Sequence, residues 1–363
     1  MASRAGTADR SEAAPWNSRT AARNRVAAWR AYEAQQLPAR RLFGLLRVLP
    51  GEDHATAAIA AAMALGLAET ESLLACLATA DLIERADART RVSVVGTAVR
   101  PAWAGAESRA IQRWYDWLLA HVRAAADLLY PQVLRLDAEP ATAIPEAAFG
   151  TPVYAATWLE TEIGTLRRAI NAAASLGLPR YAWQLADALR GYSWQEPRAM
   201  SWVGAATDAV EAARDAGTPR EVAAAYLCLA DAYFHVGDLD RAERACVALG
   251  ANASRAGWLS GAAAGHANRG GICQRRGRRM DALHQYGLAL ELYGAAGRLI
   301  GEAGVCNNIG AVYLAIGDGR QALTYHRRAL MIFRRLGSLT GEARTRQFIA
   351  AAASASRVEA RAG

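Results

Sequence analysis

Five glycines stand forty residues apart in this chain of 363 residues, and this regular step limits the folds open to it: Gly177, Gly217, Gly257, Gly297 and Gly337. A second series has the same step: Ala169, Ala209, Leu249, Ala289 and Ala329. In the last three units Gly237, Gly277 and Gly317 form a third, each followed five residues later by an alanine. A fixed period of this length indicates a repeat architecture in which each unit is one supersecondary element.

Each unit is predicted to be a pair of helices. In residues 301–337, apolar residues recur at helical spacing up to Gly317, and a second such stretch ends at Gly337. Glycine just past a helix supplies the left-handed residue that closes it. Small residues at Gly310, Ala322 and Ala329 suit two helices in close approach. This pattern resembles the tetratricopeptide repeat over 218–352 and fades over 156–217. A generic helical bundle is the alternative, although it has no reason to repeat at forty.

Composition agrees with an all-α fold. The chain is 53% hydrophobic but only 7% aromatic, because alanine, the best helix former, carries much of the apolar count. All 42 basic residues are arginine, which excludes the lysine of a P-loop and lysine-based covalent catalysis. The five cysteines are widely spaced, and the sequence shows neither a signal peptide nor a membrane span, so we expect buried thiols in a cytoplasmic protein.

The N-terminal half has a different plan. Residues 1–31 are expected to form a mostly disordered tail with a short helix over 23–32. Residues 32–104 predict helices over 37–51, 55–67 and 69–83 and a hairpin over 83–96, which is the order of a winged-helix module. A helical linker segment follows over 105–155, with a long helix at 114–130 and a proline-rich connection at 137–152. Degenerate repeats occupy 156–217, the regular repeats 218–352, and a tail 353–363.

Several segments resemble the antibiotic-regulatory, AfsR-like branch of the STAND-class regulators. They are ARRLFGLLRVLPGED, AETESLLACLATADLIE, WYDWLLAHVRAAADLLYP and the repeat starts Gly301-Glu302-Ala303 and Gly341-Glu342-Ala343. The resemblance covers about residues 32–350 and implies the sensor and interaction half of a regulator. In that family a nucleotide-binding domain precedes this region, and a His-Asp pair follows the wing strand. Here that place is Val94-Val95-Gly96, so no nucleotide or other cofactor is expected.

Stacked repeats create an extended concave surface, which is the default binding site. Its predicted lining is Asp231, Phe234, His235, Asn268, Gln274, Arg275, Asn307, Asn308, Arg344 and Gln347. Asn268 and Asn308 occupy matched positions, where an amide can donate to and accept from a peptide backbone. The alternative is that such an asparagine only bridges neighbouring repeats.

No catalytic constellation stands out, so we expect a protein that is not an enzyme. His266, Cys273 and His284 are the best metal-ligand candidates, and structural burial is the favoured interpretation for them. Arginines at 275–279 and 327–335 form basic patches that favour an acidic protein partner. The third predicted helix carries Glu69, Glu71 and Asp81, which would repel phosphate, so direct nucleic-acid binding is not expected.

Two functions follow from these observations. The first is a regulator or adaptor of specialised metabolism that binds a protein or peptide. The second is a helper that holds a substrate peptide or a tailoring enzyme in a biosynthetic complex. Whether two copies pair through the N-terminal module is left open.

Overall fold

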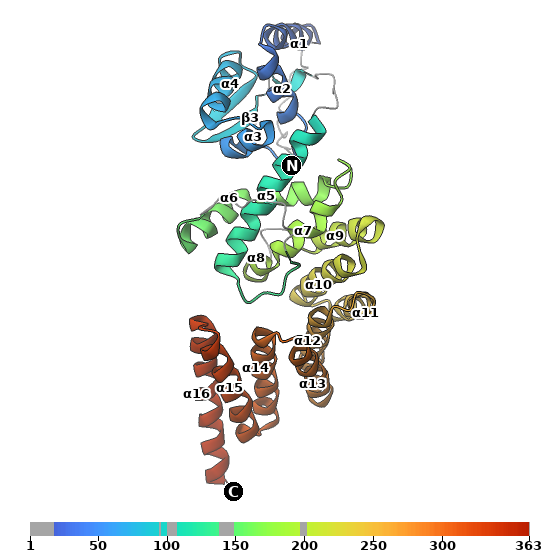
Figure 1. Ribbon diagram of the computed structural model, residues 1–363, viewed down its shortest axis with the longest axis vertical. Helices are drawn as coiled ribbons and strands as arrows, with labels where there is room; N and C mark the ends of the chain where they lie inside the picture. The colour runs from blue at the N-terminus through green and yellow to red at the C-terminus, as the bar shows by residue number, and fades with distance from the viewer. Residues whose placement is uncertain (1–17, 94–95, 100–106, 138–148, 197–201, 363) are drawn as a thin grey trace, which may run out of the picture. The chain divides into compact units, whose positions relative to one another are not determined.

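The computed structural model describes residues 18–93, 96–99, 107–137, 149–196 and 202–362 (Figure 1). The chain divides into two compact units, Met1–Trp114 and Tyr115–Gly363, which are described separately. The position corresponding to the family's His-Asp pair lies largely outside the described residues, as does the tail before Ser18.

The first unit combines helices with a small antiparallel sheet. Its elements are α1 (Ser18–Glu33), α2 (Leu37–Leu46), β1 (His54–Ala55), α3 (Thr56–Met63), α4 (Leu67–Thr79), β2 (Ile83–Ala86), β3 (Arg89–Val92) and the 3-10 turn η1 (Gly96–Ala98). The predicted three helices and hairpin are present, with the turn at Asp87, whose φ is 51°. The sheet has the order β1-β3-β2, and its two-residue β1 was not predicted. Leu42, Phe43, Ile59 and Leu74 form the core.

The second unit is a series of helical hairpins. It begins within α5 (Glu107–Leu129) and continues with α6 (Pro152–Ala172), α7 (Arg180–Ala188), α8 (Arg190–Gln195), α9 (Trp202–Ala216), α10 (Pro219–Val236), α11 (Leu239–Arg255), α12 (Leu259–Arg275), α13 (Arg279–Ala295), α14 (Leu299–Ile316), α15 (Gly319–Arg335) and α16 (Leu339–Ala362). From α10 onward each helix packs on the next, and α10, α12, α14 and α16 also contact one another in succession. The predicted all-α class and the tetratricopeptide-type superhelix are therefore confirmed.

The glycine series closes the helices as predicted, with one exception. Gly177, Gly237, Gly257, Gly277, Gly297, Gly317 and Gly337 all have positive φ. Gly217 is absent from this set, because the chain there passes directly into a capping box. Thr218 accepts from the Glu221 amide, and the Glu221 carboxylate accepts from the Thr218 amide. This reciprocal pair starts α10 without a left-handed residue.

Two predicted chain ends differ from the structure. Helix α1 begins at Ser18, which extends the short helix expected over 23–32. Helix α16 continues to Ala362, so the tail predicted over 353–363 is helical up to that residue. Alanines at 350–353 account for this, since they favour helix and lack a glycine or proline stop.

Helix α14 alone among the described helices is long and apolar enough by itself to pass a composition test for crossing a membrane. Its apolar residues have another explanation in the fold. Val305, Ile309 and Val312 are buried in the core between the hairpins.

Small residues face aromatic rings at the same forty-residue step. A Cβ atom added to Gly270 would lie 2.5 Å from the Tyr286 ring, and one added to Gly301 would lie 2.7 Å from the Tyr293 ring. At Gly310 the facing ring is His326, at 2.6 Å. In the hairpins of α12–α13 and α14–α15 the two helices can approach this closely only because Gly270 and Gly310 lack a side chain.

Gly270→Ala is therefore expected to destabilise the protein by about 1–3 kcal/mol, because overpacking displaces the buried Tyr286 ring. Gly287→Ala in the adjacent α13 is the matched control. A Cβ there meets nothing within 4 Å, so it should stabilise by about 0.5–1 kcal/mol. Thermal unfolding followed by circular dichroism measures both, and equal midpoints for the two variants would contradict the packing argument.

The five cysteines are free thiols; Cys228, Cys246, Cys273 and Cys306 are buried, whereas Cys76 on α4 is exposed, unlike the expectation that all are buried. Burial raises the pKa of Cys228 and Cys246 to about 12, so neither forms the reactive thiolate at neutral pH.

We expect a thiol reagent at pH 8 to modify the exposed Cys76 rapidly and the four buried cysteines only after urea is added. Cys76→Ser should remove the rapid phase, and a rapid phase that survives would place the reactive thiol elsewhere.

Candidate functional site

One face of the first helix in each hairpin points to the same side of the superhelix. In α10 this face carries Ala224, Leu227 and Asp231, spaced so that they lie together on a helix. The residue forty positions after Leu227 is Ala267 in α12, and the same step leads to the matching residues of α14 and α16. Ala267, Gly304, Asn307, Ala311 and Arg344 line one cavity, so these positions do share a surface. We call it the groove face.

The cavity, here the C-terminal pocket, has a volume of about 400 Å³. Its apolar wall includes Tyr293, Phe333 and Phe348. Its polar groups are amides, hydroxyls and one guanidinium: Gln132, Asn307, Asn308, Ser338, Thr340 and Arg344. Aromatic walls with a few polar groups are typical of a site that binds an amphipathic ligand.

Of the ten predicted groove residues, Asn308 and Arg344 fit the prediction most closely. Both are exposed and line the C-terminal pocket. Asn308 makes no hydrogen bond to another described residue, and the Arg344 guanidinium lies 5.7 Å from the centre of the Phe348 ring. Gln347 is exposed but does not line the cavity.

Asn307 also lines the pocket, yet its amide is committed to the fold. Its Nδ2 donates to the Thr345 hydroxyl at 2.9 Å, and its Oδ1 lies 3.0 Å from Nδ1 of His326. The residue therefore joins α14 to α15 and α16. Burial lowers the pKa of His326, which keeps this imidazole neutral at physiological pH.

Asn268 bridges repeats, the alternative considered for it, whereas its counterpart Asn308 does not. Asn268 Nδ2 donates to Oδ1 of Asp231 in the preceding repeat, at 2.6 Å. The residue forty positions after Asp231 is Gly271, which offers no acceptor side chain to Asn308. The matched positions thus have different roles because their partners differ.

The remaining predicted residues form a separate cluster at the far end of α10 and α12. Arg275 stacks 3.9 Å from the centre of the Phe234 ring and donates to the Phe234 carbonyl at 2.6 Å. His235 lies against Trp194 and Trp202, with ring centres 5.7 and 5.9 Å away. Gln274 accepts from the Tyr286 hydroxyl at 3.1 Å. The structure therefore places these residues in a cluster of their own, and none of them lines the C-terminal pocket.

A buried charge network lies beneath the groove face and was not predicted. Arg190 of α8 places its Nε 3.2 Å from Asp231 and its Nη1 3.4 Å from Asp187. All three side chains are almost fully buried. Burial raises the pKa of both carboxyls above their ordinary value of 3.8, and the Arg190 charge opposes that rise. Asp231 is thus a structural residue and not a free ligand of a partner.

This network holds the segment Tyr130–Asp137, which we call the connector; it begins with a turn in which the Val133 amide donates to the Tyr130 carbonyl at 3.0 Å. Arg190 Nη2 donates to the Leu134 carbonyl, and the Leu136 amide donates to Asp187 at 2.7 Å. Leu134 is buried in a cluster with Ala224, Leu227 and Trp258. The connector therefore occupies the groove face at α10, and its Gln132 borders the C-terminal pocket.

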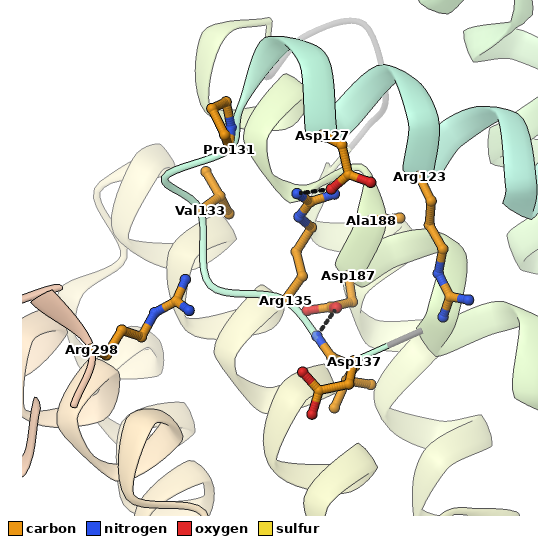
Figure 2. Close-up of a pocket in the computed structure, with 10 residues that line it drawn as sticks. Arg123, Asp127, Pro131, Val133, Arg135, Asp137, Asp187, Ala188 and Arg298 are labelled. Atoms are coloured by element: carbon orange, nitrogen blue, oxygen red, sulfur yellow. Dashed lines mark hydrogen bonds and ion pairs between the residues drawn. The ribbon is translucent and has the colours of Figure 1, made fainter. Parts of the chain in front are cut away.

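A second cavity, of about 280 Å³, is lined in large part by the connector (Figure 2). Pro131, Val133 and Arg135 line it from the connector, and Arg298 enters from the start of α14. Arg135 donates to Asp127 at 2.7 Å. Residues of the connector thus line both cavities.

Two of the three metal-ligand candidates have structural partners, whereas His284 is exposed and not buried as expected. His266 Nδ1 lies 2.9 Å from the Gln285 side-chain oxygen, and Arg278 approaches the Cys273 sulfur at 3.6 Å. Within the described ranges, no group of three potential ligands could hold a metal ion. Arg276 in the basic patch pairs with Glu243 and Asp240, and its hydrogen bond lowers the pKa of Glu243. Part of that patch is therefore neutralised.

Neither a family model nor a curated protein matches the sequence. Among solved structures, the chain is similar to BtubC from P. vanneervenii, with 21% identity and a TM-score of 0.44 over 55% of this chain and 84% of that one. It is also similar to a signal transduction ATPase with numerous domains that has a tetratricopeptide repeat sensor, from Pyrococcus horikoshii. There the identity is 16% and the TM-score 0.42, over 89% of this chain and 48% of that one. At this level of similarity neither structure transfers a function to this chain.

Arg190→Gln is expected to destabilise the protein by about 3–5 kcal/mol, because it leaves Asp187 and Asp231 buried without their cation. The pKa of each carboxyl then rises further in the folded state. When the pKa of a carboxyl is higher in the folded state than its unfolded value of 3.8, the folded state binds more protons between these two pKa values. The free energy of unfolding therefore decreases as the pH rises from the unfolded pKa to the folded pKa. The free energy of unfolding of the variant should therefore fall more steeply than that of the wild type as the pH rises above about 4, the ordinary pKa of an aspartate.

Urea unfolding at several pH values measures this effect. Arg241→Gln is the matched control, since Arg241 forms an exposed pair with Asp238 and should cost about 1 kcal/mol or less. Parallel pH profiles for wild type and Arg190→Gln would contradict a buried network.

Proposed function

We propose that this chain is a non-enzymatic repeat protein that binds an extended peptide or protein segment and acts as a regulator or adaptor. The observation that carries the proposal is the C-terminal pocket, where Asn308 and Arg344 present unengaged polar groups beside aromatic walls. An amide reads a peptide backbone, and a guanidinium recognises a carboxylate through its planar fork. These groups suit binding rather than a chemical step.

The partner is proposed to be an acidic protein rather than a nucleic acid. The first unit has the helix order and the β1-β3-β2 sheet of a winged helix, which supports that assignment. Its α4, in the position of a recognition helix, carries the exposed Glu69. Glu71 on the same helix pairs with Arg85 at 2.5 Å. The exposed Glu69 carboxylate disfavours a phosphate backbone at this position. The resemblance to AfsR-like proteins is what points to specialised metabolism.

The test is a selection from a displayed library of random 12-residue peptides with the purified full chain. We expect the selected peptides to bind the wild type at least tenfold more tightly than Asn308→Ala/Arg344→Ala, a difference of about 1.4 kcal/mol. Gln321→Ala/Arg335→Ala, which removes an exposed amide and arginine on α15, should bind like the wild type. Failure to select any peptide, or equal binding to both double variants, would refute binding at the pocket.

A further inference from the structure

We infer that the connector is a tethered ligand of the groove, and that the partner is an extended segment with the pattern Leu-x-Leu-Asp that competes with it. This inference rests on the proposed function and deepens it, because it names the partner's chemistry and how access is controlled. The connector is a segment of this chain seated on the same groove face that opens, one repeat later, into the C-terminal pocket.

Two buried charged side chains of the groove form hydrogen bonds with the backbone of the connector. Arg190 donates to the Leu134 carbonyl, and Asp187 accepts from the Leu136 amide at 2.7 Å. These contacts use one acceptor and one donor of the main chain, two residues apart. Any extended segment offers the same pair of groups, so this part of the site is independent of sequence.

The side chains add specificity. Leu134 is buried against Ala223, Ala224 and Leu227, and Leu136 packs at the edge of the same cluster. The Asp137 carboxylate accepts from Arg220 at 2.6 Å, and that guanidinium lies over the Trp258 ring, 5.6 Å from its centre. Arg135, between the two leucines, pairs instead with Asp127 of α5. The seat therefore selects two apolar side chains and a following carboxylate, while the middle side chain turns to Asp127 and is only 14% exposed.

Tyr130 at the start of the connector is buried against Gly191, but the residues after it and the C-terminal end are held more weakly than the centre. Pro131 and Gln132 are exposed, and the Asp137 side chain is 82% exposed, so its pair with Arg220 is a surface interaction that salt screens. A partner that also fills the C-terminal pocket gains contacts with Asn308 and Arg344 that the connector does not make. The connector has the opposing advantage that it is covalently joined to the groove, which gives it an effective concentration on the order of millimolar.

The experiment uses the full chain and a fluorescent peptide of sequence YPQVLRLD, residues 130–137. Leu134→Ser/Leu136→Ser should release the connector, so trypsin should cleave after Arg135 at least tenfold faster than in the wild type. In fluorescence anisotropy the peptide should bind this variant at least tenfold more tightly than the wild type. A YPQVSRSD peptide should bind neither. Leu128→Ser, which alters an exposed leucine of α5, is the matched control and should behave as the wild type.

A second measurement needs no variant and covers the case in which the double substitution unfolds the chain. Excess YPQVLRLD peptide should accelerate hydrogen exchange at the wild-type Leu136 amide while α10 stays protected. Tight binding of the peptide to the wild type with no change in exchange would overturn the inference, as would an absence of binding to a folded, released variant. If the library yields pocket-binding peptides without the Leu-x-Leu-Asp pattern, this inference fails and the proposed function stands.

Discussion

The close approach of small residues to aromatic rings is the contact on which the repeat array depends. Gly270 and Gly310 allow the second helix of each hairpin to place Tyr286 or His326 directly against the first. Gly301 and Gly341 allow the next hairpin to pack on Tyr293 or Phe333. Because both contacts recur at forty residues, each hairpin takes nearly the same position on its predecessor. The groove face is a consequence of that regular stacking.

The buried charges join the regular repeats to the helices that precede them. Asp187 and Arg190 belong to the degenerate part of the array, whereas Asp231 and Asn268 belong to successive regular hairpins. An isolated buried charge would destabilise the fold, but here each carboxylate meets a cation and at least one hydrogen-bond donor. Two polar atoms of the connector's backbone complete the set. The same interactions thus order the start of the groove and hold the segment that lies in it.

The boundaries of the helical hairpins and the helix order of the first unit were predictable from sequence, but the partners of individual side chains were not. The glycine series predicted the hairpin boundaries because a left-handed residue is required at each. The prediction fails at Gly217, which has no positive φ. There the capping box of Thr218 and Glu221 starts the next helix. Matching Asn268 with Asn308 predicted a common role, but a side chain's role depends on what faces it, and Gly271 replaces Asp231.

The position of the connector could not be predicted from sequence, since it has neither helical spacing nor a repeat, and its contacts lie more than fifty residues away at Asp187 and Arg190.

The position of the connector also bears on how such a protein can evolve. The connector binds beside α10, at the first regular hairpin, while the open pocket lies at α14 and α16. Duplication of a forty-residue unit near the C-terminus would therefore lengthen the exposed surface and leave the occupied end intact. Natural selection can in this way change the length of the groove without changing the connector that is proposed to compete with the partner.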